Sequence, residues 1–219
     1  MSKEKALILL SGGQDSTSAA VWAQAGNYDL TAIIFDYGQR HKVEIESAKR
    51  IADMLRIPFF IKEVKGVFPT TSALTNPSLK IKTNKKTNLP TSFVPGRNIL
   101  FLTIAAAEAY ARDIHYLITG VSEEDYSGYP DCRNATITSL TETLNLGMEY
   151  DIQIKTPWMY KSKVDEINFL AAQGLLPILG YTHTCYNGIV GGCGRCPACR
   201  IRAKAFRNSA FKDPLKERR

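Results

Sequence analysis

Residues 5–17, Lys5-Ala-Leu-Ile-Leu-Leu-Ser-Gly-Gly-Gln-Asp-Ser-Thr17, decide the fold. Lys5 to Leu10 is a short apolar run that predicts a buried strand, and residues 17–25 predict a helix. The turn between them contains two glycines and, with Thr17, three hydroxyl side chains. Glycine lets the backbone approach a ligand closely, and a helix N-terminus offers free N–H groups and a positive dipole end. The pattern predicts a phosphate-binding turn, with an ordinary capped helix as the alternative.

Strand and helix patterns alternate along the rest of the chain. Beyond the first pair, the periodicity predicts strands at 30–35, 58–64, 115–119 and 151–155, and helices at 43–55, 98–110, 133–148 and 163–173. Such alternation predicts an α/β fold, an open Rossmann-like parallel sheet covered by helices on both faces, in a single domain spanning residues 1–219. Ligands of such sheets bind beyond the carboxyl ends of the strands.

One segment interrupts this alternation. Residues 66–95 contain four prolines and no sustained periodicity, and Lys80 to Pro90 contains four lysines and no acid. The length predicts a lid or a disordered insertion.

Composition and charge restrict the class of protein. The 219 residues are 44% hydrophobic and 22% charged, which excludes collagen, coiled coil and global disorder. The net charge is +7, and residues 200–219 hold eight Lys/Arg against Asp213 and Glu217. We interpret this tail as solvated charge, with contact to a phosphate-bearing ligand or an oligomer partner as the alternative. The first apolar run is too short for a signal peptide or a membrane span, so we expect a cytoplasmic protein that binds no membrane. Because the positive charge is concentrated in one tail and one loop and does not form a uniform basic face, we also expect no binding of nucleic acid.

Four cysteines lie close together near the end of the chain. Cys185, Cys193, Cys196 and Cys199 follow the spacing C-x7-C-x2-C-x2-C. In a reducing compartment this clustering indicates metal ligands, and four thiolates predict one closed, structural Zn²⁺ site in a small C-terminal lobe at about 180–210. His183 in place of one cysteine, an iron–sulfur cluster and a redox dithiol are the alternatives.

The phosphate-binding turn resembles the Ser-Gly-Gly-x-Asp-Ser signature of the PP-loop ATP pyrophosphatases. It is neither a Walker A loop nor the dinucleotide fingerprint G-x-G-x-x-G. The resemblance implies an adenine nucleotide alpha hydrolase-like fold and cleavage of ATP between its α- and β-phosphates. It also implies Mg²⁺ bound with ATP and faced by Asp15, and a nucleotide site formed by Leu10, Ser11, Gly12, Gly13, Asp15, Ser16 and Thr17.

Four further motifs narrow the resemblance. Residues 36–41 (Asp-Tyr-Gly-Gln-Arg-His), 93–98 (Phe-Val-Pro-Gly-Arg-Asn), 129–133 (Tyr-Pro-Asp-Cys-Arg) and 184–188 (Thr-Cys-Tyr-Asn-Gly) occur in this order before the last three cysteines. Together they resemble the 7-cyano-7-deazaguanine synthase family of queuosine biosynthesis. The resemblance implies a homodimeric ligase that uses ATP and ammonia to convert 7-carboxy-7-deazaguanine into the 7-cyano base, releasing AMP and pyrophosphate.

Residue roles follow from this resemblance as hypotheses. Asp15, Arg97 and Lys163 are the expected catalytic residues, Arg97 holding the substrate carboxylate or an ATP phosphate. The expected substrate-binding residues are Arg97, Tyr129, Asp131 and Arg133, with Asp131 accepting N–H groups of the guanine-like edge. Ordinary helix-start positions for Arg97 and Lys163, and a turn position for Asp131, are the alternatives.

Two other functions remain open at the level of sequence. A tRNA-modifying PP-loop enzyme would use the basic tail on RNA phosphates. A zinc-ribbon nucleic-acid-binding module would explain the cysteines but leaves the glycine-rich turn unexplained.

Overall fold

The computed structural model describes residues 3–76, 78–80, 89–123 and 129–217. These residues form five strands: β1 (Glu4–Leu9), β2 (Tyr28–Asp36), β3 (Phe59–Glu63), β4 (Tyr116–Ile118) and β5 (Gln153–Lys155). All four neighbouring pairs are parallel, and the strand order is β3-β2-β1-β4-β5. The predicted open parallel sheet is confirmed.

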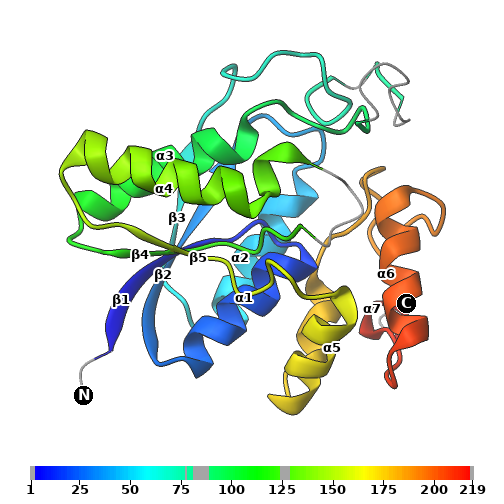
Figure 1. The fold of residues 1–219 in the computed structure, drawn as a ribbon. Coiled ribbons are helices and arrows are strands. Elements are labelled where there is room, and N and C mark those ends of the chain that lie inside the picture. The colour runs from blue at the N-terminus through cyan, green and yellow to red at the C-terminus, as the bar shows by residue number, and fades with distance from the viewer. Residues whose placement is uncertain (1–2, 77, 81–88, 124–128, 218–219) are drawn as a thin grey trace.

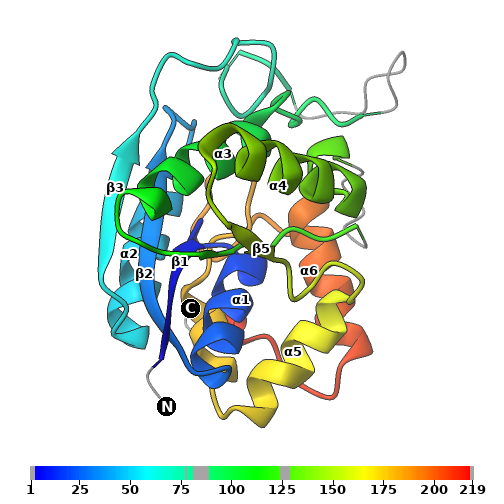
Figure 2. The same cartoon turned by 60° about the vertical axis from the view of Figure 1, so that its left-hand side comes forward.

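Helices cover both faces of the sheet (Figure 1). One face carries α1 (Gln14–Ala25) and α2 (Val43–Leu55), with α5 (Lys163–Ala172) packed beside α1. The other face carries α3 (Arg97–Tyr110) and α4 (Asn134–Met148), and the turned view in Figure 2 separates the two layers. Within β1, Ala6 and Ile8 enter the core under α1 and α2, whereas Leu7 enters the core under α3 and α4. Both faces are apolar, as expected for a parallel sheet buried on both sides.

The order of the strands determines where a ligand site can form. From β1 the chain proceeds outward through β2 and β3, then crosses over to β4 and β5 on the other side of β1. The connections that leave β1 and β4 therefore diverge to opposite faces of the sheet. A crevice opens at such a switch point, beyond the carboxyl ends of the strands.

The basic tail differs from the sequence prediction. Residues 197–208 form a helix, α6 (Pro197–Asn208), which packs against α5, and a short helix α7 (Pro214–Glu217) follows. Arg202 of α6 is 4% exposed and pairs with Asp213 through Nε (2.9 Å) and Nη2 (2.7 Å). The interpretation of the whole tail as solvated charge is therefore wrong for Arg202, because an acid eleven residues later neutralises it inside the fold.

The described part of the segment 66–95 packs onto the domain. Ser72 and Ala73 are fully buried, and Ala73 N donates to Thr91 O at 2.7 Å. The expectation of a lid or a disordered insertion covers residues 66–95, of which residues 77 and 81–88 lie outside the described residues. No helix in the described ranges has the length and apolar character needed to cross a membrane.

Candidate active site

The predicted phosphate-binding turn, residues 11–17, connects β1 to α1 beside the switch point between β1 and β4. Ser16 Oγ accepts a hydrogen bond from Ser11 N (3.2 Å), and Thr17 Oγ1 donates to Gly13 O (2.7 Å), so the turn is held by its own hydroxyls. Gly12 has φ +78°, and a Cβ there would lie 2.6 Å from Glu44 O and collide with the backbone of α2. Only glycine fits this close approach. The helix begins at Gln14, so the last residues of the turn form its first N–H groups.

A cluster of charged side chains lies beside this turn. Lys163, the first residue of α5, pairs with Asp15 of α1 and lies 3.7 Å from a carboxylate oxygen of Glu166. Glu166 is 1% exposed and accepts a hydrogen bond from Ser18 Oγ at 2.9 Å. Burial and the neighbouring Asp15 raise the pKa of Glu166 well above its usual range. The lysine charge is thus held at the turn by Asp15 of α1, with the Glu166 carboxyl group close by.

A cavity of about 290 Å³ opens at the carboxyl ends of β1, β2 and β4. Of the sequence-predicted residues, it is lined by Leu10, Ser11, Gly13, Asp15, Ser16, Arg97 and Tyr129. A second cavity of about 170 Å³ is lined by Lys163 together with residues of α6, and it shares Gly13 and Asp15 with the first. The phosphate turn therefore forms a wall common to two neighbouring cavities.

Arg97 is the cation of the larger cavity that is best placed for an anion. It is the first residue of α3, and its guanidinium lies 5.8 Å from the centre of the Tyr37 ring. Its Nε is buried and has no hydrogen-bond partner among the described residues. A buried donor without a partner is costly, so a ligand acceptor would stabilise it. A planar guanidinium is suited to a carboxylate or a phosphate.

The other predicted substrate residues are placed differently. Tyr129 lines the cavity, and its hydroxyl bonds Ser92 Oγ at 2.8 Å. Asp131 is 5% exposed, and its Oδ2 accepts a hydrogen bond from Asn98 N (3.0 Å) in the first turn of α3. Its Oδ1 has no partner among the described residues, and Arg133 is exposed and outside the cavity wall. Substrate-binding roles for Asp131 and Arg133 stay predictions.

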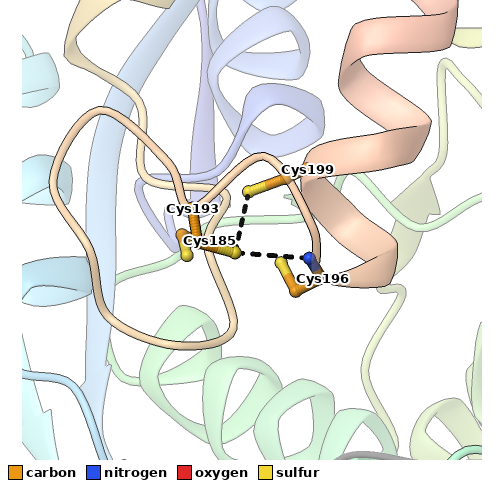
Figure 3. Close-up of side chains that lie close together, drawn as sticks. All are labelled: Cys185, Cys193, Cys196 and Cys199. Atoms are coloured by element: carbon orange, nitrogen blue, oxygen red, sulfur yellow. Dashed lines mark hydrogen bonds between the residues drawn. The ribbon is translucent and has the colours of Figure 1, made fainter.

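The four predicted metal ligands come together (Figure 3). The thiols of Cys185, Cys193, Cys196 and Cys199 lie within 4.8 Å of one another. Cys193 Sγ is 4.0 Å from Cys199 Sγ and accepts a hydrogen bond from Cys196 N at 3.2 Å. Four sulfurs bound tetrahedrally to Zn²⁺ at about 2.3 Å would be about 3.8 Å apart, so the cluster fits a metal ion such as zinc.

The segment that carries the four cysteines, residues 183–199, is called the cysteine lobe here, and it contacts the phosphate turn directly. His183 N donates to Gly12 O at 2.9 Å, and the His183 ring bonds the backbone of Cys185 at 2.9 Å. The His41 ring, from the loop after β2, bonds Tyr186 O at 3.0 Å and fills the space next to Gly188. The lobe therefore forms part of the site. His183 contributes a hydrogen bond to the backbone, whereas four thiols already complete the metal cluster.

Sequence patterns did not single out several residues of the cavity wall. Tyr37 and Tyr186 occur only within motifs, and no sequence pattern gives Glu44 or His183 a role in binding ATP or the substrate. Glu44 looks like an ordinary charged residue of a helix start. Its burial against the phosphate turn depends on how α2 packs, which local spacing does not encode.

Comparison with known proteins identifies the family. A sequence model described as "Queuosine biosynthesis protein QueC" matches residues 5–210. The chain belongs to this family. Among curated QueC relatives, the 7-cyano-7-deazaguanine synthase of Laribacter hongkongensis is 44% identical over 218 residues, covering 98% of this chain and 95% of the relative. The 7-cyano-7-deazaguanine synthase of Clostridium botulinum strain 657 is 44% identical over 210 residues, covering 94% of this chain and 96% of the relative.

A solved structure supports the fold of this QueC member. A 4-thiouridine synthetase in complex with RNA and bound ATP aligns with a TM-score of 0.52 at 18% identity, covering 93% of this chain and 50% of the other. This likeness concerns the arrangement of the sheet and helices.

Proposed function

We propose that the protein is an ATP-dependent synthase that converts 7-carboxy-7-deazaguanine and ammonia into 7-cyano-7-deazaguanine, releasing AMP and pyrophosphate. The observation that carries the proposal is the meeting of the phosphate turn and Arg97 in one cavity, in a chain of the QueC family. The family match favours this reaction over tRNA modification and over a zinc-ribbon module.

The chemistry explains why the site needs both a turn that binds ATP and a cation that binds the substrate carboxylate. A carboxylate is a poor acyl donor because its leaving group would be oxide. Transfer of AMP to the carboxylate creates a good leaving group, ammonia then gives the amide, and a second adenylation on the amide oxygen permits elimination to the nitrile. Such transfers depend on positioning and on charge neutralisation.

The described residues can be assigned to these tasks. We expect the turn from Ser11 to Thr17 to hold the pyrophosphate portion of ATP through backbone N–H groups and hydroxyls. Lys163 neutralises charge on the transferred phosphoryl groups, and Arg97 orients the substrate carboxylate. Asp15 lies in the cavity wall with 27% of its side chain exposed, so it can face Mg²⁺ bound with ATP, which would supply further neutralisation.

Zinc, the compartment and the oligomeric state are further parts of the proposal. The all-cysteine cluster supports a closed structural Zn²⁺ site, because it leaves no open position for catalysis. The absence of disulfides among the five described cysteines and the use of ATP are compatible with the reducing cytoplasm. The homodimer is implied by resemblance, and light scattering on the purified protein tests it.

One assay tests the function. The purified protein is incubated with ammonium, 7-carboxy-7-deazaguanine and ATP labelled at the α-phosphate, and the products are separated and weighed by mass spectrometry. We expect the nitrile, labelled AMP and pyrophosphate, formed only when all three substrates are present. Labelled ADP with orthophosphate, or no nitrile, would refute the proposal.

A further inference from the structure

Glu44, in the first turn of α2, lines the cavity together with Arg97 and Tyr37. Its side chain is partly buried, and among the described residues no group donates a hydrogen bond to its carboxylate. The other glutamate of this turn, Glu46, is exposed and pairs with Lys49 at 2.8 Å. The start of α2 thus has one acid that is exposed to solvent and a second acid that lines the cavity.

Close packing fixes the position of Glu44 beside the phosphate turn. An added Cβ on Gly12 would lie 2.6 Å from Glu44 O and 2.7 Å from Ala48 N. The next residue, Ile45, is 7% exposed and belongs to the core under α1 and α2. The backbone that carries the Glu44 carboxylate is therefore held against the loop that we expect to bind ATP.

The surroundings of Glu44 suit proton exchange near neutrality. Burial raises the pKa of Glu44 to about 7, although the Arg97 guanidinium acts in the opposite direction. Burial also raises the pKa of Tyr37 to about 12, so this phenol remains neutral and does not compete as a base. A carboxyl group whose pKa lies near the working pH is an efficient proton acceptor.

The proposed reaction needs such an acceptor. The nitrogen enters as ammonium and ends as a nitrile nitrogen that carries no hydrogen, so every N–H proton must leave during the two adenylation cycles. Both oxygens of the substrate carboxylate depart with AMP, and the reaction needs no oxidant and no reductant. Arg97, which we expect to orient the substrate carboxylate, is close enough to Glu44 for their charges to interact. Because Glu44 and Arg97 line the same cavity, we expect the acid to lie near the carbon that ammonia attacks.

We propose that the Glu44 carboxylate binds ammonium in this cavity and accepts its protons as the nitrogen becomes first an amide and then a nitrile. This role rests on the proposed function. In the first cycle ammonium gives one proton to Glu44, the nitrogen lone pair forms a C–N bond as the C–O bond to AMP breaks, and the resulting C–NH3⁺ group loses a second proton through Glu44 to give the amide. In the second cycle the adenylated amide loses its remaining N–H protons as the second C–O bond breaks, and Glu44 returns each proton to water.

Other titratable groups of the cavity wall belong to the pH test. They are Asp15 on α1, Tyr37 after β2, Arg97 on α3, Tyr129, Cys132, His183 and Tyr186. A pH dependence near 7 is therefore assigned to Glu44 only if its substitution removes that dependence.

The experiment separates adenylation from nitrogen chemistry. Glu44→Gln, Glu44→Asp and the control Glu46→Gln are compared with the unsubstituted protein in two assays. Exchange of labelled pyrophosphate into ATP with 7-carboxy-7-deazaguanine, without ammonium, reports adenylation of the carboxylate. Nitrile formation with saturating ammonium, followed from pH 5.5 to 8.5, reports the complete reaction. Thermal unfolding confirms that each variant is folded.

We expect Glu44→Gln to keep exchange within about threefold and to lose nitrile formation by about a hundredfold or more, together with the pH dependence near 7. Glu44→Asp should recover part of the nitrile formation, and Glu46→Gln should behave like the unsubstituted protein. Equal loss of exchange and nitrile formation in Glu44→Gln would overturn the proposal, as would nitrile formation at the unsubstituted rate. If the unsubstituted protein exchanges pyrophosphate but makes no nitrile, the proposed function itself fails, and the role of Glu44 fails with it.

Discussion

Lys163 at the start of α5 forms an ion pair with Asp15 in the first turn of α1, although 148 positions separate the two residues in the chain. This contact joins the phosphate turn to the far side of the smaller cavity. It places a positive charge where α1 presents its N-terminal N–H groups. We therefore expect anion binding at this place to depend on both α1 and α5.

Removal of the lysine charge should weaken ATP use. We expect Lys163→Ala to lower kcat/KM for ATP by about 10- to 100-fold, because a charge-assisted contact contributes about 1.5–3 kcal/mol. AMP release measures the effect. Lys161→Ala is the matched control, because Lys161 is exposed and lines neither cavity. Equal losses in the two variants would remove the assignment of Lys163.

A methyl group on Gly12 should distort the turn. Gly12→Ala places a Cβ 2.6 Å from Glu44 O at a residue with φ +78°, so the turn or α2 must move. We expect destabilisation by about 1–3 kcal/mol and severe loss of ATP turnover, measured by denaturant unfolding and by AMP release. The control is Gly147→Ala in α4, where the space is open and added helix propensity is neutral or stabilising. A fully active Gly12→Ala protein would contradict this account.

Loss of one thiolate should remove the metal. We expect Cys185→Ser to lower the zinc content from about one per chain to well below one and to lower the melting temperature, because metal binding contributes to folding. Elemental analysis and thermal unfolding provide the two measurements. Cys132→Ser leaves the cluster intact and should keep its zinc. Iron in a coloured protein would show a different metal.

The Glu44 carboxyl should make stability depend on pH. Its pKa is raised from 4.5 to about 7 in the fold, so the folded state binds this proton more tightly than the unfolded state. The stabilisation is complete below about pH 4.5 and is lost as the pH rises through about 7. Glu44→Gln cannot ionise, so its melting temperature should rise relative to the unsubstituted protein between pH 5 and 8. A difference that stays constant with pH would contradict the raised pKa, and Glu46→Gln is the exposed control.

The buried partner of Arg202 should be important for the fold. Asp213→Ala leaves a 4% exposed guanidinium without its carboxylate, and we expect a loss of about 3–5 kcal/mol in denaturant unfolding. Lys212→Ala, at the exposed neighbouring position, should change stability by less than about 0.5 kcal/mol. Similar effects in the two variants would contradict a structural role for the pair.

Sequence periodicity predicts the sheet because its central strands β1, β2 and β4 are short apolar runs with buried residues, whereas the edge strands β3 and β5 are only partly buried. It places α1 three residues late, since Gln14 and Asp15 belong to the phosphate turn and to the helix at once. It misses α6 because dense positive charge conceals an amphipathic pattern that begins at Pro197 and contains the buried residues Arg202 and Phe206. A run of basic residues predicts exposed side chains only where no acid pairs with them inside the fold, and Asp213 is such an acid for Arg202.

The phosphate turn and the cysteine cluster could be predicted because each is nearly continuous in the chain. The cavity that they border could not, because it joins the ends of three strands with residues from α2, α3 and the cysteine lobe. Asp131 shows that a sequence motif can also indicate a ligand contact where the structure has a hydrogen bond within the protein. Its motif indicates a ligand contact, whereas the structure shows one oxygen bound to the start of α3.

The hydrogen bond from His183 N to Gly12 O makes the cysteine lobe a brace for the nucleotide turn. If the cluster binds zinc, as we propose, a polypeptide synthesised while metal is scarce should lack the ordered lobe that supports Gly12 through this hydrogen bond. Metal supply would then set the share of working molecules, independently of how many are made.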